Sequence, residues 1–158
     1  METGKKQKKH TVNEPAIAYT RNNISHVVGQ FLDISPAKLD EPLSRVKIFR
    51  EGLKKESLEC LKSKTGLDYQ TLARALSVSS KTLQRTKIFG TVQSEKMYAL
   101  AGLYALGMSY FGEDGFKAWM NRPLFSLGNR IPLELLDVSE GVTLLRAEIM
   151  RLQHGIAL

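Results

Sequence analysis

The stretch YQTLARALSVSSKTLQRTKI, residues 69–88, decides the fold class of this 158-residue chain. Its apolar spacing predicts two short helices joined by a tight turn, the first capped by Asp68 and the second by Ser79. Helices that cross steeply need a small residue at the crossing, an apolar plug in the turn and an apolar inward residue on the second helix. Ala73, Val78 and Leu83 supply these three features. The stretch therefore predicts a helix-turn-helix.

The remaining positions of the second helix are hydrophilic and are expected to point outward. In the major groove of DNA, Arg and Lys can bond guanine, Gln can bond adenine, and Ser and Thr can reach bases or phosphates. The predicted DNA-binding residues are Ser79, Ser80, Lys81, Thr82, Gln84, Arg85 and Lys87. Ser77 departs from the usual pattern, because Gly normally holds this turn position and other residues pay for a left-handed backbone. The alternative is a pair of packed helices with a solvated basic face.

The positive charge of the chain gathers around this motif. The formal net charge is +7, and residues 45–96 carry twelve basic against five acidic groups. Residues 1–13 add four lysines against one glutamate, whereas residues 97–158 carry five basic and six acidic groups. We therefore expect a polyanionic partner for the middle third and a different role for the last third. The first dozen residues predict a mobile basic arm, which either touches DNA or is merely solvated.

The other segments also have helical spacing, which predicts an all-α fold. Ser94 is predicted to cap a long helix, and the spacing of Asp137 and Glu140 predicts a capping box that opens the last helix. Pro132 suits the first position of a short helix. Residues 17–32 suggest a short helix or an irregular wrapping segment, and residues 33–42, with two prolines, suggest a linker.

The sequence offers little that would build a catalytic site. His10, His26 and His154 lie far apart, and no His, Cys, Asp and Glu residues cluster at metal-ligand spacing. Cys60, the single cysteine, sits on an apolar helical face and is expected to be an inert thiol. No signal peptide or membrane-spanning run is recognisable. We expect a cytoplasmic protein that is not an enzyme, needs no cofactor or metal and does not bind a membrane.

Two longer segments, residues 52–85 and 111–141, and a final helix that ends RLQHG carry a family resemblance. Its most specific positions are Trp119, Pro123, Leu127–Gly128, Pro132–Asp137 and Gly141. With these motifs the chain resembles the Xre/MbcA/ParS family of bacterial antitoxins from about residue 48 to residue 157. Three positions depart from the family pattern, namely Asn129, Val138 and His154, and the basic cluster after the second helix is thin.

The resemblance implies a function that the residue patterns alone do not give. Members pair with a RES-type toxin, which consumes NAD or transfers ADP-ribose from it. Their C-terminal domain covers the toxin, the terminus blocks access to the NAD site, and the helix-turn-helix represses the shared operon. The resemblance thus implies three partners: a RES-type toxin, operator DNA and a second copy of the chain within a hetero-oligomeric complex.

The terminal stretch RLQHGIAL, residues 151–158, is unusually apolar for a chain end. Gly155 can end the last helix in a left-handed cap, and Arg151 can meet the helix dipole or an acidic group on the toxin. The predicted toxin-binding residues are Arg151, His154, Gly155, Ile156, Ala157 and Leu158. Alternatively, the terminus folds back over the chain's own core. The preceding stripe suits either a core or an intermolecular seam: Val142, Leu145, Ile149 and Leu152.

We therefore expect three parts. Residues 1–45 form a flexible basic arm with a linker or wrapping segment, residues 46–92 an Xre-like helix-turn-helix region, and residues 93–158 a compact helical toxin-binding region. The predicted function is that of an antitoxin and autorepressor. The alternative is a stand-alone helix-turn-helix transcriptional regulator whose C-terminal helices only dimerise.

Overall fold

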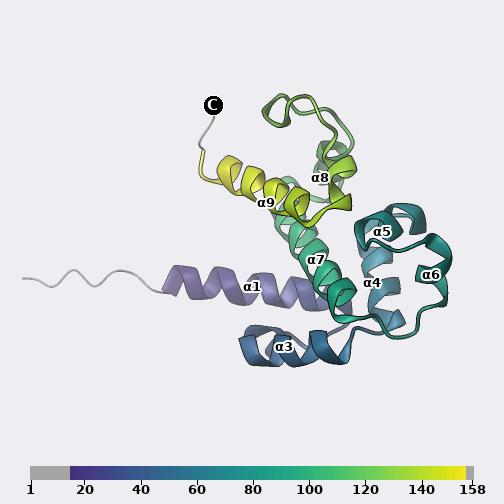
Figure 1. The fold of residues 1–158 in the computed structure, drawn as a ribbon. Coiled ribbons are helices and arrows are strands. Elements are labelled where there is room, and N and C mark those ends of the chain that lie inside the picture. The colour runs from purple at the N-terminus through teal and green to yellow at the C-terminus, as the bar shows by residue number, and fades with distance from the viewer. Residues whose placement is uncertain (1–14, 156–158) are drawn as a thin grey trace, which may run out of the picture.

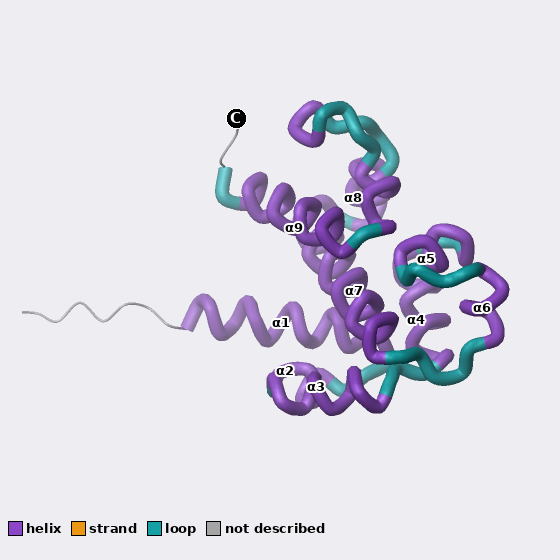
Figure 2. The backbone as a smooth tube through the Cα atoms, in the orientation of Figure 1, coloured by secondary structure: helices purple, strands orange, loops and turns teal. Residues whose placement is uncertain are grey.

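The computed structural model describes the backbone of residues 15–155 and the side chains of residues 24–155. The predicted basic arm and three of the predicted toxin-binding residues, Ile156, Ala157 and Leu158, lie outside this range. Between residues 15 and 155 the structure forms helices and loops without a strand (Figure 2), which confirms the all-α prediction. The helices are α1 (Pro15–Leu32), α2 (Pro36–Asp40), α3 (Pro42–Glu51), α4 (Lys55–Thr65), α5 (Tyr69–Ala75), α6 (Ser80–Arg85), α7 (Thr91–Phe111), α8 (Glu113–Met120) and α9 (Ser139–Gln153), with short 3-10 helices η1 (Phe125–Leu127) and η2 (Pro132–Asp137).

Helix α7 is the central element of the fold (Figure 1). It packs against α1, α3, α4, α8 and α9. Every residue from Leu100 to Gly107 is buried, and a helix that is buried on all sides belongs to a core. The apolar stripe predicted for this core is confirmed, since its members are buried or half-buried: Met97, Leu100, Ala101, Tyr104, Met108 and Phe111.

The start of α7 differs from the prediction. Helix α7 begins at Thr91, after Gly90, and Ser94 is fully buried inside its beginning rather than capping it. The Ser94 Oγ accepts a hydrogen bond of 2.9 Å from the backbone N–H of Leu53. The predicted cap is wrong because this hydroxyl satisfies a backbone group that is distant in sequence. It thereby ties α7 to the segment that leads into α4.

The N-terminal helices contribute to the core. Helix α1 packs against α4 and α7, and its residues Val28, Phe31 and Leu32 are buried. The linker predicted for residues 33–42 is wrong, because α2 lies there and buries Leu39 completely. The two prolines of this segment begin α2 and α3, where a missing N–H costs nothing and a fixed φ favours the helix.

Aromatic rings hold α8 against α7. The Trp119 ring stacks on Phe111 and Phe116, with centroid separations of 5.4 and 5.8 Å. Gly107 of α7 faces the Phe116 ring so closely that an added Cβ would overlap it. These contacts confirm the expectation that Trp119 and Phe116 are core residues.

The predicted capping box at the start of α9 is wrong. Helix α9 begins at Ser139 without a side-chain cap, and Asp137 is the last residue of η2. Gly141 instead lies against η2, where an added Cβ would overlap the backbone carbonyl of Leu135. The close approach of two backbones therefore fixes this junction. Pro132 begins η2, as predicted.

Candidate functional site

Helices α5 and α6 form the predicted helix-turn-helix. The Asp68 carboxylate accepts a 2.7 Å hydrogen bond from the Thr71 N–H, and this bond lowers the pKa of Asp68. The Ser79 Oγ accepts a 3.0 Å hydrogen bond from the Thr82 N–H. Both predicted caps are therefore confirmed. The inward residues also match the prediction: Leu72, Ala73, Leu76 and Leu83 are buried and Val78 is half-buried.

The turn between the two helices has the backbone that the sequence predicts. Ser77 has a φ of 55°, in the left-handed region that usually favours glycine. The Lys96 ammonium donates a 2.7 Å hydrogen bond to the Ser77 hydroxyl. A serine in this position thus gains a side-chain partner from α7 that a glycine would lack.

The predicted DNA-binding residues lie together on and beside α6. Six of them are exposed and Ser80 is half-buried: Ser79, Lys81, Thr82, Gln84, Arg85 and Lys87. The hydroxyls of Ser79 and Thr82 lie 2.8 Å apart and bond each other. This surface presents hydrophilic donors and acceptors of the kinds that read base edges and bind phosphates.

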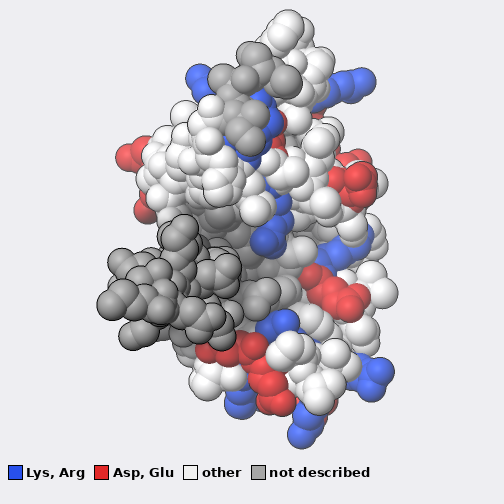
Figure 3. Space-filling model, turned by 90° about the vertical axis from the view of Figure 1, so that its left-hand side faces the viewer, with Lys and Arg blue, Asp and Glu red and all other residues white. Residues whose placement is uncertain are grey.

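The segment that runs from α5 into the start of α7 carries charged side chains of one sign. Residues 69–94 contain four basic residues and no Asp or Glu: Arg74, Lys81, Arg85 and Lys87. All four are exposed. The side opposite α6 differs, because Lys and Arg are interspersed there with Asp and Glu (Figure 3). The helix-turn-helix therefore has the local charge that attracts a polyanion.

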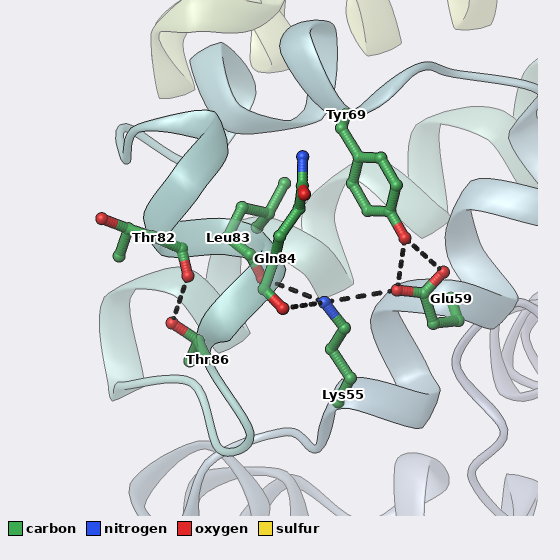
Figure 4. A network of polar contacts seen from close by, with 7 residues as sticks. All are labelled: Lys55, Glu59, Tyr69, Thr82, Leu83, Gln84 and Thr86. Carbon is green, nitrogen blue, oxygen red and sulfur yellow. Dashed lines mark hydrogen bonds and ion pairs between the residues drawn. The ribbon is translucent and has the colours of Figure 1, made fainter.

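A polar network that the sequence reasoning missed supports the end of α6 (Figure 4). The Lys55 ammonium of α4 donates hydrogen bonds to the backbone carbonyls of Leu83, at 3.2 Å, and Gln84, at 2.9 Å. It also lies 3.4 Å from the Glu59 carboxylate. A cation at a helix C-terminus stabilises the helix through its dipole and its unpaired carbonyls. Lys55 therefore caps the C-terminal end of α6 from a neighbouring helix.

Tyr69 of α5 extends this network. The Tyr69 hydroxyl donates to the Glu59 carboxylate and lies 2.7 and 2.8 Å from its two oxygens. This hydrogen bond raises the pKa of Tyr69. The Lys62 ammonium lies 4.9 Å from the centre of the same ring. The network thus joins α4, α5 and α6. The four-residue spacing of Lys55 and Glu59 was the one sequence signal for it.

The described members of the predicted toxin-binding set, Arg151, His154 and Gly155, lie at the end of α9. The Arg151 guanidinium donates two hydrogen bonds to the Glu148 carboxylate, of 3.0 and 2.6 Å, which lowers the pKa of Glu148. His154 and Gly155 are exposed. Gly155 has a φ of +68° and its N–H donates to the Leu152 carbonyl, which confirms the predicted left-handed end.

The stripe along α9 divides between two surroundings. Val142, Leu145 and Ile149 are buried, and α9 packs on α7. Leu152 is half-buried and lines an open cleft of about 680 Å³, beside Tyr110 and Phe125. The stripe therefore serves the core along most of its length and a surface cleft at its end.

The described residues show neither a metal-binding group nor a membrane-spanning helix. In that part of the chain no three His, Cys, Asp or Glu side chains come together as metal ligands. None of its helices has the length and apolar character needed to cross a bilayer.

The Cys60 thiol donates to the backbone carbonyl of Gln30, at 3.1 Å.

Comparisons with known proteins match both regions. Residues 44–102 match the antitoxin Xre-like helix-turn-helix domain, and residues 106–155 match the antitoxin Xre/MbcA/ParS C-terminal toxin-binding domain. The chain is 25% identical over 128 residues to the Prs ADP-ribosylating antitoxin of Sphingobium sp. (strain YBL2), covering 72% of this chain and 80% of that protein. It is 31% identical over 91 residues to antitoxin Xre of Yersinia enterocolitica, covering 54% and 62%. With both regions matched, the chain belongs to the Xre/MbcA/ParS family of antitoxins.

Proposed function

We propose that this chain neutralises an NAD-consuming RES-domain toxin by covering the toxin's active site, and that it represses its own operon through the helix-turn-helix. One observation carries the proposal: an exposed, polar recognition helix and a matched toxin-binding domain occur in the same chain. The name of the Sphingobium relative includes ADP-ribosylation, and ADP-ribosyl groups are taken from NAD. This name supports a toxin that consumes NAD.

In the proposal, α6 enters the major groove of the operator. Lys81, Gln84 and Arg85 face base edges, while Ser79 and Lys87 contact phosphates. The single sign of charge across residues 69–94 supports this orientation. Two copies of the chain would then read two half-sites about 34 Å apart, one turn of the duplex.

The toxin-binding half of the proposal uses the end of α9. The φ of +68° at Gly155 turns the chain away from the helix axis. We propose that the residues after it, Ile156, Ala157 and Leu158, enter the cleft that leads to the NAD site. Ordering three or four residues costs a few kcal/mol, because each fixed backbone costs about 1–2 kcal/mol. Arg151 and His154 then lie at the edge of the contact.

The DNA half is tested with the double variant Lys81→Ala/Arg85→Ala in a mobility-shift assay on operator DNA. Both side chains are exposed, so the fold should survive. We expect salt-sensitive binding by the natural chain and its loss in the variant. An unchanged shift would refute the assignment of α6 to DNA.

The toxin half is tested by deleting residues 155–158. The truncated chain should still bind operator DNA but should protect cells and stop NAD consumption less well than the full chain. Full rescue by the truncated chain would place the terminus on the chain's own core instead.

A stand-alone regulator would bind the operator and fail to co-purify with the toxin. Mass measurement of the complex would count the copies of each chain.

A further inference from the structure

The most exposed large apolar side chain of the described residues lies within the toxin-binding domain. Phe125 is 90% exposed and is the first residue of η1, on the loop between α8 and α9. The part of this loop that holds η1 lies at the top of Figure 1, whereas α6 lies at the right. A single exposed apolar side chain is ordinary on a protein surface, but Phe125 adjoins a cleft lined by other apolar side chains, and exposed apolar patches mark interaction sites.

The loop holds Phe125 in a defined place. The Leu124 N–H donates to the Arg130 carbonyl at 3.1 Å, and the Asn129 N–H donates back to the Leu124 carbonyl at 2.9 Å. The Gly128 N–H donates to the Phe125 carbonyl at 3.0 Å. These bonds close the loop on itself. A ring on such a backbone loses little conformational freedom when a partner covers it.

A second set of contacts fastens the loop to α9. The Ser126 hydroxyl donates a 2.6 Å hydrogen bond to the Glu148 carboxylate. The same carboxylate accepts the hydrogen bonds of Arg151, and its side chain is only 11% exposed. The exposed ring is therefore fixed relative to the helix that carries the predicted toxin-binding residues.

Phe125 stands beside a concave apolar surface. The cleft of about 680 Å³ is lined by the aromatic side chains of Tyr110, Phe111 and Trp119, and by Leu124 and Leu152. Apart from Phe125 itself, the rest of the lining is polar or charged: Arg122, Ser126, Glu148 and Arg151. An exposed aromatic ring next to a cleft lined by aromatic residues and arginine has the composition that carries most binding energy in protein interfaces.

We infer that Phe125 and the adjoining cleft, here called the Phe125 surface, form the principal anchor for the toxin. The ring enters an apolar pocket of the toxin, the cleft receives an apolar toxin side chain, and Arg122 meets a toxin carboxylate. The toxin is the expected partner because every residue that lines the cleft falls within residues 106–155, the part matched to the toxin-binding domain. The inference rests on the proposed function and deepens it.

The test compares Phe125→Ser with a matched control, Leu43→Ser, on the full chain. Leu43 is 75% exposed on α3, outside the cleft. Binding to the purified RES-domain toxin of the same operon is measured by surface plasmon resonance. We expect Phe125→Ser to weaken binding about 10- to 100-fold, as an anchoring residue does, and Leu43→Ser to leave it within about twofold.

The outcomes separate the anchor from the proposed function. If the natural chain and both variants bind the toxin equally, the anchor is refuted and the function stands. If the natural chain does not bind the toxin at all, the proposed function fails first. A photo-crosslinking amino acid at position 125 should couple to the toxin. Coupling to a second copy of the chain or to its own C-terminal residues would overturn the inference.

Discussion

Replacing Lys55 by Met tests how α6 is held in the position proposed for binding DNA. The substitution keeps the aliphatic length and removes the ammonium group that bonds the carbonyls of Leu83 and Gln84. Because α6 spans only six residues, most of its order must come from contacts outside it. We expect α6 to lose order in the free protein without any change in the residues that face DNA.

The magnitude follows from the geometry. A cation at a helix C-terminus contributes about 0.3–1 kcal/mol, and a hydrogen bond to a charged group contributes about 1.5–3 kcal/mol net in a buried setting. The Lys55 side chain is 26% exposed, so solvent competes in part. A net loss of about 1–2 kcal/mol would weaken operator binding about 5- to 30-fold, since α6 must be ordered again on binding.

Fluorescence anisotropy on operator DNA at several salt concentrations distinguishes a residue that positions α6 from one that contacts DNA directly. A residue that binds phosphate adds to the salt dependence of affinity, whereas one that only positions α6 does not. Lys55→Met should therefore lower the affinity and keep the salt slope, while Lys81→Ala should reduce the slope. Lys117→Met, on α8, is the control for loss of one positive charge. Unchanged affinity in Lys55→Met would show that Lys55 does not order α6, and a reduced slope would show that it binds phosphate directly.

Three further predictions concern the scaffold. Ser77→Gly should raise the free energy of unfolding by about 0.5–1 kcal/mol in urea titrations, since it relieves a left-handed serine; a lower value would show that the Lys96 hydrogen bond outweighs the strain. Gly141→Ala should lower it by about 1–3 kcal/mol, because the new Cβ meets the Leu135 carbonyl; an unchanged melting temperature would argue against that close approach. The hydrogen bond from Arg151 is the main cause of the lowered pKa of Glu148. Ionised Glu148 should therefore stabilise the fold at pH values above the pKa of the unfolded chain, near 4.5. This stabilisation should be lost as the pH falls through the lower pKa of Glu148 in the folded protein. The stability difference between the natural chain and Glu148→Gln should therefore shrink in acid, and a constant difference would contradict the assignment.

Local rules predicted the helix-turn-helix because its determinants lie close together in sequence. Asp68 and Ser79 each cap a helix through an N–H three residues ahead, and Ser77 occupies the turn position that requires a positive φ. The candidate DNA-facing residues follow from the same reasoning, since positions around one inward leucine on a short helix must point outward.

Longer-range determinants escaped the sequence. Serine is a favoured residue at helix N-caps, so Ser94 was expected to cap α7. Its hydroxyl instead accepts a hydrogen bond from the backbone N–H of Leu53, a contact that no local pattern indicates. The same holds for Lys55, whose carbonyl partners lie on another helix. The position of Phe125 was also missed, because an isolated apolar residue in a loop gives no periodic signal. Burial and exposure of such residues are decided by tertiary packing.

The proposed neutralisation is tested by titrating the purified RES-domain toxin with the chain while NAD consumption is followed. NAD consumption should stop when the chain saturates the toxin. The variant Lys81→Ala/Arg85→Ala, which is expected to lose operator binding, should stop it equally well. Undiminished NAD consumption in the presence of saturating natural chain would show that the chain does not neutralise the toxin.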